Sequence, residues 1–589
     1  MMSTTDDTDK RLLQLAELRK KHGFQGQRSA GQWSKGVLAQ QSGSMEELPA
    51  QQTQWPKNAL LYNLLSQKFG FLGFNWEAKE KVWKGSTRRF VDFVGYPMVA
   101  GYHPSLTELA FMPIELVDNF EEAQGMTAIR AMEGLTAVGF ENKRARMDAT
   151  GIGYKGMSGV SWIPALEPIV LPTELRQQLQ RLADAVLLLN DAVTACYTSD
   201  SALQDLLTRN VPSRIPQIMA PGTVDVIRPD IVIVREKDGF RPVVTELESA
   251  PAGMGMLHAM EVGYGVDTTM LDRFIEYLDG RQYVIFATHQ WAEYTFELAV
   301  FCQALRTRGV PAWIIFDRLL ETVQEHARKT WQLPPNAPEH VCNAWDTDFL
   351  GRITRLGFRE FIRGSHELPK QFDDRTVVYR FGYFDNFSRG TLEQMLEWQQ
   401  QGITVINPVQ FPLESKVLMA AIGIPSVRRW ITERDEEAVW VLQTCLAETR
   451  LLNGCTETEL SEYTNDRPFW ISKYAAWDGN NQSWGSRSLE VGAQHLVSGW
   501  EGILRQRREC AWPVVVQHMI NSARFTVGCV NSDGKIAIKT DLRNRLTPFF
   551  LRGKDGKAVM TSSMITLRGN TIRIHGATDA VETLVVYRD

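Results

Sequence analysis

Residues 228–251, RPDIVIVREKDGFRPVVTELESAP, predict a β-hairpin with three carboxylates at one end. The run Ile231–Val234 consists of β-branched residues, which favour a strand. Asp238-Gly239 supplies a turn, and Pro242–Thr245 begins the return strand. The strand then ends at Pro251 and the glycines that follow it.

The three carboxylates belong to Asp230, Glu246 and Glu248. Strand side chains alternate with a period of two, so Glu246 and Glu248 share one face. Asp230 lies opposite one of them if the turn around Gly239 is bulged or longer than two residues, whereas a two-residue turn would point it to the other face. Three carboxylates on one face repel one another unless a cation lies among them. Hard oxygen ligands suit Mg²⁺, which takes substrate phosphates as further ligands. The alternative is an edge hairpin whose acids face water.

The overall composition is that of a globular enzyme with several domains. The chain has 589 residues, 44% of them hydrophobic and 23% charged, which predicts two to four domains. Its net charge of -5 gives no global basic field, so we expect no nucleic-acid partner. The N-terminus is polar, and no apolar run reaches about 18 residues. These features predict a cytoplasmic protein with no membrane partner.

The middle of the chain predicts a Rossmann-like parallel sheet. Strands are expected at 282–289, 312–317, 377–380 and 404–407, and the helices 293–308 and 392–400 alternate with them. The sheet lacks the Gly-x-Gly-x-x-Gly fingerprint after its first strand. The one glycine-rich run, Gly151–Gly159, is interpreted as a surface loop in preference to a phosphate site.

Other segments predict helices before the hairpin and strands near the C-terminus. Apolar spacing predicts helices at 171–197 and 201–208. The C-terminal part predicts an antiparallel sheet with strands at 513–518, 525–530, 536–539, 563–567, 571–575 and 583–587.

Two lysines and a polar loop are candidates for phosphate binding. Lys416 follows a strand and begins a predicted helix, a position that favours phosphate, although it also suits a solvated helix-start lysine. Lys473 ends a short strand and is followed by the loop Asp478–Ser486, which is rich in Gly, Asn and Ser. Such a loop predicts a closing lid that contains Gly479, Ser483 and Gly485.

The Arg228-x-Asp230 pair, the hairpin and the Glu246-x-Glu248 pair before Pro251 resemble the metal-binding hairpin of the ATP-grasp ligases. That family usually has Asn where Glu248 stands. Here the hairpin also precedes Lys416 and Lys473, an order that resembles the circularly permuted ATP-grasp family with its glutathionylspermidine synthase-like ligases.

Further segments resemble the same permuted family over residues 171–589. They are Val378–Arg380 with Asp385, Asn407-Pro408 to Lys416, Val515–Gln517, Thr540–Phe550 and His575–Val585. The predicted lid lacks the Gly-Arg-Glu-Gly pattern of glutathionylspermidine synthases, which puts that particular substrate pair in doubt.

The resemblance implies ATP and Mg²⁺ and a role for each matching residue. Asp230, Glu246 and Glu248 would hold Mg²⁺, and Arg228 would contact the γ-phosphate or an acyl phosphate. Lys416 and Lys473 would bind the other phosphates. The set is completed by the adenine-facing residues Gln517, His518 and Met519, by the lid, and by Arg380, which either orients the substrate carboxylate or is a buried structural arginine.

These observations predict an ATP-dependent carboxylate–amine ligase that acts through an acyl phosphate on a carboxylate and an amine, with a homodimer as one candidate assembly. A small-molecule phosphotransferase and a non-catalytic nucleotide-binding scaffold are the alternatives. The expected fold is α+β and α/β, a permuted ATP-grasp fold with a Rossmann-like pre-ATP-grasp domain and a helical N-terminal region. Its expected parts are a partly disordered segment 1–55, a mixed helical region 56–220, the hairpin part 221–275, the Rossmann-like domain 276–415 and the nucleotide-binding domain 416–589.

Overall fold

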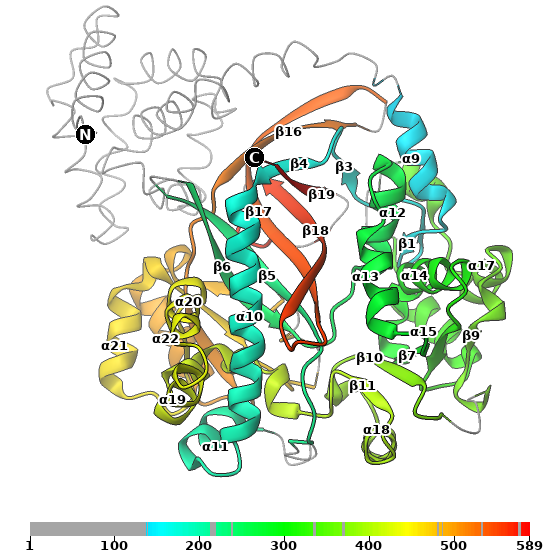
Figure 1. Cartoon of the computed structure of the whole chain (residues 1–589). Helices are drawn as coiled ribbons and strands as arrows, with labels where there is room; N and C mark the ends of the chain where they lie inside the picture. Colours follow the sequence, from blue (N-terminus) through cyan, green and yellow to red (C-terminus); the bar gives the residue numbers. More distant parts are fainter. Residues whose placement is uncertain are drawn as a thin grey trace, which may run out of the picture.

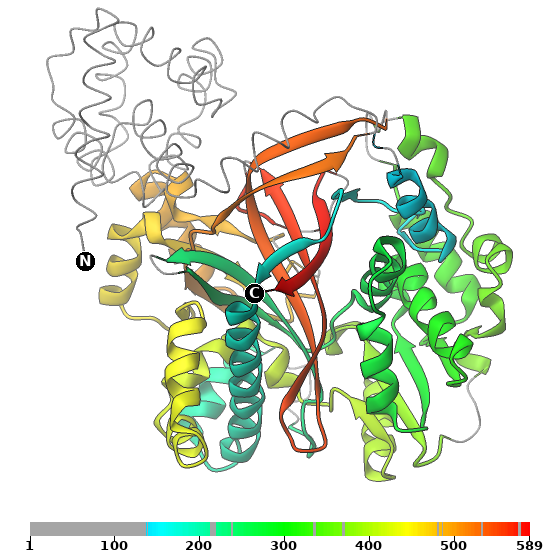
Figure 2. The same ribbon diagram turned by 45° about the horizontal axis from the view of Figure 1, so that its top comes forward.

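The protein is a mixed α+β molecule, seen in a computed structural model (Figures 1 and 2). The structure describes residue 137 and residues 139–588, except 212–218, 237–238, 334–336, 338, 368–371, 480–481, 484, 486, 532–533, 570, 575 and 577–578. The predicted segment 1–55 and most of the region 56–220 therefore lie outside the described residues. Within the described ranges, no helix has the length and apolar character needed to cross a membrane.

The largest sheet joins the predicted hairpin to strands near the C-terminus. Its eight strands include six in the order β3 (Ile163–Pro164), β19 (Val581–Arg588), β18 (Ala558–Gly569), β17 (Ile536–Arg552), β5 (Val226–Glu236) and β6 (Gly239–Glu248). Two further strands lie off this path, with β16 (Arg524–Val530) paired with β17 and β4 (Ile169–Pro172) paired with β19. Residues more than 300 positions apart in sequence thus lie on adjacent strands.

One face of this sheet is covered by α10 (Thr173–Cys196), which confirms the predicted helix (Figure 1). Its leucines at 175, 179 and 182 recur at helical spacing and are buried. They join one hydrophobic core with Ile231 and Ile233 of β5 and Leu546 of β17. The opposite face of the sheet is left for the polar side chains described below.

The predicted parallel sheet is confirmed. Its five strands are all parallel and follow the order β11 (Thr404–Ile406), β10 (Thr376–Phe381), β7 (Gln282–Ala287), β8 (Ala312–Phe316) and β9 (Ile362–Arg363). The predicted helices are α14 (Thr295–Thr307) and α18 (Arg389–Gln400). This region lies on one side of the eight-stranded sheet in both ribbon views (Figures 1 and 2).

A separate four-stranded sheet lies on the other side, with its helices α21 (Glu457–Asn465) and α22 (Val497–Arg508) (Figures 1 and 2). Its order is β12 (Thr449–Leu451), β15 (Val514–His518), β13 (Trp470–Tyr474) and β14 (Glu490–Val491). The prediction that strand 513–518 shares one sheet with the later strands is therefore wrong. The sequence identifies a strand but does not say which partner it pairs with.

Two further predictions need correction. The predicted strand 571–575 is wrong, because residues 571–574 form a loop. The run Gly151–Gly159 is not a surface loop but contains a small hairpin of β1 (Gly153–Tyr154) and β2 (Met157–Ser158), several of whose residues are buried. Tyr154 is half-buried and packs edge-on against Tyr294.

The remaining helices complete the layers. The α-helices are α9 (Phe140–Ala149), α11 (Ser201–Thr208), α12 (Met254–Tyr264), α13 (Thr269–Leu278), α15 (Leu320–Thr330), α16 (Glu339–Ala344), α17 (Phe349–Arg355), α19 (Pro425–Thr432) and α20 (Glu436–Cys445). The 3₁₀ helices are η4 (His289–Tyr294), η5 (Phe358–Glu360), η6 (Ser365–Glu367), η7 (Phe384–Asn386), η8 (Phe411–Glu414), η9 (Lys416–Gly423), η10 (Arg467–Phe469) and η11 (Gly492–Gln494).

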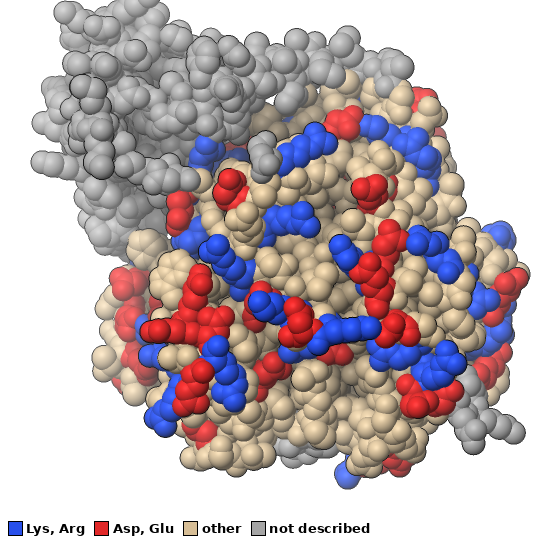
Figure 3. Space-filling model, in the orientation of Figure 1, with Lys and Arg blue, Asp and Glu red and all other residues tan. Residues whose placement is uncertain are grey.

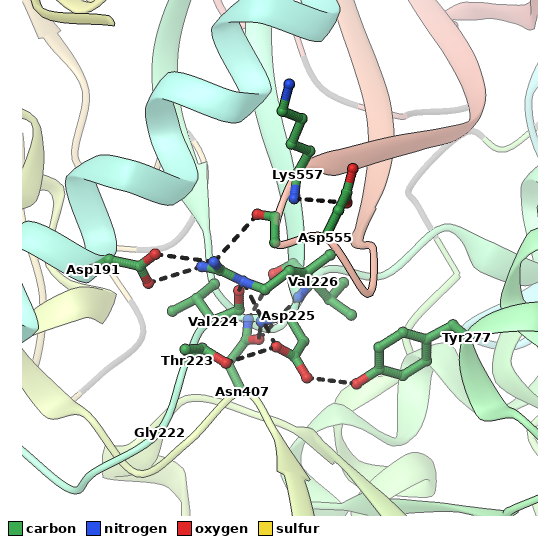
Figure 4. Close-up of polar contacts among 12 residues, drawn as sticks. Asp191, Gly222, Thr223, Val224, Asp225, Val226, Tyr277, Asn407, Asp555 and Lys557 are labelled. Carbon is green, nitrogen blue, oxygen red and sulfur yellow. Dashed lines mark hydrogen bonds and ion pairs between the residues drawn. The ribbon is translucent and has the colours of Figure 1, made fainter. Parts of the chain in front are cut away.

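Buried polar contacts tie the base of the hairpin to the parallel sheet (Figure 4). Asn407, which follows β11, accepts hydrogen bonds from the amides of Asp225 and Val226 and donates to the carbonyls of Val226 and Ser249. Arg552 of β17 makes a bidentate ion pair with Asp191 of α10, with N···O distances of 2.8 and 2.9 Å. The two ends of the hairpin, residues 225–226 and 249, are thereby fixed to one point.

The outer surface carries both signs of charge. On the face shown in Figure 3, Lys and Arg side chains are interspersed with Asp and Glu side chains. Several form surface ion pairs, such as Arg389 with Glu393. The charges that matter for the site lie inside the molecule instead.

Candidate functional site

The hairpin brings the three predicted carboxylates onto one face. Asp230 lies directly opposite Glu246, and Arg228 lies directly opposite Glu248. The predicted bulge exists but at a different place, because Glu236 pairs with Gly239 and the register shifts instead at Thr245. This one-residue shift gives Asp230 and Glu246 the same orientation.

Four cations surround these carboxylates. Lys416 Nζ lies 2.7 Å from Glu246 Oε1, and Arg545 donates to Asp230 Oδ2 at 3.0 Å. Arg228 lies 3.5 Å from Asp230 Oδ1. Lys473 is held beside them, since its ammonium donates to the Thr245 carbonyl at 3.1 Å. Lys416, Lys473, Asp230 and Glu246 are all buried.

The four cations lie on the eight-stranded sheet, on the small sheet and on the 3₁₀ helix η9. Lys416 begins η9, a 3₁₀ helix where an α-helix was predicted, and the Ser415 side chain caps it. Lys473 lies in β13 of the small sheet. Arg545 lies in the centre of β17, and the sequence analysis missed it. The predicted strand covered only residues 536–539 of β17 (Ile536–Arg552), so residue 545 lay outside it.

Burial and like charges shift the pKa values in this cluster. Burial raises the pKa of Glu248 to about 7, and the negative charges of Glu246 and Asp230 add to the rise. Burial likewise lowers the pKa of Lys473 to about 8, with Lys416 contributing and Glu246 opposing the shift. Both groups thus change charge close to neutral pH.

The predicted lid contacts one of the lysines. Lys416 Nζ donates to the Ser483 carbonyl at 2.6 Å. The loop is closed on itself by Asp478, whose carboxylate accepts from the amides of Gln482 and Ser483. Gly479 and Gly485 both have positive φ, which explains glycine at these turns. The lid positions 480, 481, 484 and 486 lie outside the described residues.

The three predicted adenine-facing residues do not share one face. Gln517 faces the hairpin and donates to the Thr245 carbonyl at 3.2 Å and to Thr449 Oγ1 at 2.9 Å. His518 points to the other side of β15, where its ring stacks on Phe469. Met519 packs against a small apolar cluster that includes Leu489 and Val491. Only Gln517 therefore directs its side chain toward the hairpin.

Arg380 lies behind the cluster instead of in it. It is fully buried and pairs with Glu414 at 2.6 Å, and Glu414 also accepts from the Phe384 amide. Only Nη1 of Arg380 makes hydrogen bonds, since Nε and Nη2 are buried without a hydrogen-bond partner. Burial raises the pKa of Tyr383, two residues after β10, and the charges of Glu248 and Glu246 raise it further. His289 is held by Asp317 at the C-terminal end of β7.

The carboxylates are chemically suited to Mg²⁺ that arrives with phosphates. Within the described ranges, no group of three or more His, Cys, Asp or Glu side chains is arranged so that it could hold a metal ion. Mg²⁺ in phosphate sites takes only one or two protein carboxylates and completes its shell with phosphate and water. Asp230 Oδ1 is buried without a hydrogen-bond partner and has the Arg228 guanidinium 3.5 Å away, so a cation bound there would share this oxygen with the arginine.

Comparisons with solved structures find chains of low similarity, among them a glutathione synthetase-like effector and a putative gamma-glutamylcysteine synthetase. No protein-family model matches the sequence, and no curated protein matches it. The apo form of a glutathione synthetase-like effector from Globodera pallida is 12% identical, covers 78% of this chain and 99% of its own, and has a TM-score of 0.45. A putative gamma-glutamylcysteine synthetase from Methylobacillus flagellatus KT is 9% identical, covers 67% and 86% respectively, and has a TM-score of 0.31. At these TM-scores the similarity carries no argument about chemistry, which rests on the side chains described above.

Proposed function

We propose that this protein is an ATP-dependent ligase that joins a carboxylate to an amine. One observation carries the proposal: three carboxylates and four cations, drawn from two sheets and the 3₁₀ helix η9, converge on one buried face of the hairpin. A structural need alone does not account for so many charged side chains gathered in one interior. A nucleotide triphosphate with Mg²⁺ requires both signs of charge at close quarters.

The proposed roles follow from position. Lys416 and Lys473 bind phosphate oxygens of ATP, and Gln517 and the lid residues from Asp478 lie on the nucleotide side. Arg228 and Arg545 flank Asp230 and contact the phosphoryl group being transferred. Asp230 and Glu246, with Glu248, hold Mg²⁺, which when bound neutralises charge on the phosphates. Arg380 pairs with Glu414 through Nη1, while its Nε and Nη2 are buried without a hydrogen-bond partner, so both a structural role and the orientation of the substrate carboxylate fit this residue.

The proposed reaction has two steps. The substrate carboxylate attacks the γ-phosphorus, and the bond to ADP breaks. The amine then attacks the acyl carbon, and phosphate leaves with the electron pair of its bond to carbon. Lys416, Lys473 and the two arginines stabilise the charge that develops on the oxygens, and their burial strengthens this effect because water is excluded.

The proposal includes a circularly permuted ATP-grasp arrangement. The eight-stranded sheet supplies the metal face, and the small sheet of β12–β15 supplies Lys473 and Gln517. The parallel sheet would be the pre-ATP-grasp part. The order of these parts along the chain, with the hairpin before both lysines, supports the permutation.

The test is ATP consumption with defined substrates. Purified protein is incubated with ATP, Mg²⁺, a panel of amino-acid and dipeptide carboxylates, and primary amines, and ADP and phosphate release are measured. A ligase releases phosphate only when both a carboxylate and an amine are present. Release of ADP with a carboxylate or hydroxyl compound alone, yielding a stable phosphorylated product, would identify a phosphotransferase instead. Nucleotide binding without any turnover would identify a scaffold.

A further inference from the structure

A second acidic side chain, Glu582, lies on the same sheet face as the carboxylate cluster. On β19 it pairs directly with Thr566 of β18, which in turn pairs with Arg545 of β17. Arg545 reaches Asp230 of β5, which pairs with Glu246 of β6. Directly paired residues point to the same side of a sheet. Glu582, Thr566, Arg545, Asp230 and Glu246 therefore form one row across five strands.

Glu582 is built into this row as a buried and oriented acid. It is 2% exposed, and Thr566 Oγ1 donates to its Oε1 at 3.3 Å. Burial raises the pKa of Glu582 to about 7, although the positive charges of Arg545 and Arg228 act in the opposite direction. The two arginines lie between Glu582 and the carboxylates that would hold Mg²⁺.

The surroundings of Glu582 differ from those of the nucleotide side. Tyr154 of the small β1–β2 hairpin is half-buried, and burial first, then the charge of Glu293 and more weakly that of Glu582, raise the pKa of that phenol. Lys416, Lys473 and Gln517 lie at the opposite end of the row, toward β6 and the small sheet. The row thus has Lys416 and Lys473 at the end that is proposed to bind phosphate and Glu582 at the other end, with the two arginines between them.

We infer that Glu582 is the general base that accepts a proton from the amine when the amine attacks the acyl phosphate. This inference rests on the proposed ligase function. As the carbon–nitrogen bond forms, one N–H proton passes to the Glu582 carboxylate, and the carbon–oxygen bond to phosphate breaks with its electron pair on the leaving phosphate. A carboxylate whose pKa lies near neutral pH is well matched to this task.

Two nucleophiles of similar size distinguish this role from a structural one. Methylamine is protonated at neutral pH and needs a base, whereas hydroxylamine is largely unprotonated and needs far less help. The experiment compares the full chain and its Glu582→Gln variant with ATP, Mg²⁺, the same carboxylate panel, and either methylamine or hydroxylamine. We expect the ratio of methylamine to hydroxylamine turnover to fall about 100-fold or more in Glu582→Gln, with hydroxylamine turnover largely kept.

The control is a matched buried acid elsewhere. Glu261 of α12 is 1% exposed, has a pKa that burial raises to about 7, and accepts from Thr269 Oγ1 and the Met270 amide. Glu261→Gln is expected to leave the methylamine to hydroxylamine ratio unchanged. Glu582→Asp keeps a carboxylate and should restore part of the methylamine turnover.

The outcomes of this experiment distinguish a general base from a structural residue at Glu582. An unchanged ratio in Glu582→Gln overturns the role of Glu582 while the ligase proposal stands. Equal loss with both nucleophiles, or loss of folding in both Glu582 variants by circular dichroism, assigns Glu582 to structure and also overturns the inference. If the unaltered protein consumes no ATP with any carboxylate and either nucleophile, the ligase proposal is wrong. The role of Glu582 as general base, which depends on it, is then wrong as well.

Discussion

Glu246 lies next to both a positively charged and a negatively charged side chain of the cluster. Its carboxylate touches Lys416 and lies opposite Asp230, so it faces both the phosphate side and the metal side. We expect Glu246→Gln to lower Mg²⁺-dependent ATP turnover by about 100-fold or more, because the amide cannot balance the cations or bind Mg²⁺ well. The fold should persist, since the amide is isosteric. Turnover is measured by ADP release, with circular dichroism as the check on folding.

The same hairpin offers a matched control for that change. Glu236 lies at its exposed end and pairs with Arg241. Glu236→Gln should leave ATP turnover within about twofold, because exposed ion pairs contribute little. Normal turnover in Glu246→Gln would contradict the metal site.

Two shifted groups set a pH window for nucleotide binding. The pKa of Glu248 is raised to about 7, so below that pH it is protonated and binds Mg²⁺ poorly. The pKa of Lys473 is lowered to about 8, so above that pH it loses the charge that attracts phosphate. Affinity for ATP with Mg²⁺ should therefore be highest between about pH 7 and 8 and fall on both sides. Calorimetric titration across this range measures it, and Glu248→Gln should remove the acid-side decline.

At the scale of elements, the lid is held by a contact that nucleotide binding must change. The Ser483 carbonyl occupies Lys416, and the Gln482 and Ser483 amides donate to Asp478. A phosphate oxygen competes for the same ammonium, and the loop amides are then free to bind phosphate. We expect hydrogen exchange at Gln482 and Ser483 to change more than threefold on addition of a non-hydrolysable ATP analogue with Mg²⁺.

The turn Gly553–Gly556 between β17 and β18 serves as the internal reference for that measurement. It is a surface turn at the far end of the strands, and its exchange should not respond to nucleotide. If the lid amides likewise do not respond while the analogue demonstrably binds, the lid assignment is wrong.

The sequence pattern predicted those helices and strands whose formation depends on residues close together in the sequence. The apolar spacing of α10, the alternation along β5 and β6, and the strands of the parallel sheet were all visible in the sequence. The carboxylates could be grouped because they belong to one hairpin. Arg545 and Glu582 were missed because their place depends on the register between strands hundreds of residues apart. The side-chain direction of His518 follows from strand alternation, because neighbouring residues of β15 point to opposite faces, and it was overlooked when Gln517, His518 and Met519 were grouped together.

At the scale of the whole molecule, Asn407 joins two sheets. It is 2% exposed and uses its amide group in four hydrogen bonds to the backbone at both ends of the hairpin. Asn407→Ala would leave buried N–H and carbonyl groups without partners. We expect the free energy of unfolding to fall by about 2–4 kcal/mol, measured by urea denaturation.

Asn465 on α21 is the comparison for that variant. It is exposed and donates only to the Ser461 hydroxyl one turn earlier. Asn465→Ala should change the free energy of unfolding by no more than about 0.5 kcal/mol. Equal effects of the two changes would contradict the role given to Asn407.

The large sheet also has a consequence for synthesis on the ribosome. Residues 226–248 leave the ribosome well before the strands β17, β18 and β19 that complete their sheet, which end at residue 588. At about 5–20 residues per second, the nascent hairpin waits on the order of 15–70 s with β5 unpaired along one edge. An unpaired β-branched edge is a site for wrong pairing with other chains. This protein is therefore expected to depend on chaperones during translation more than a chain whose neighbouring strands follow one another.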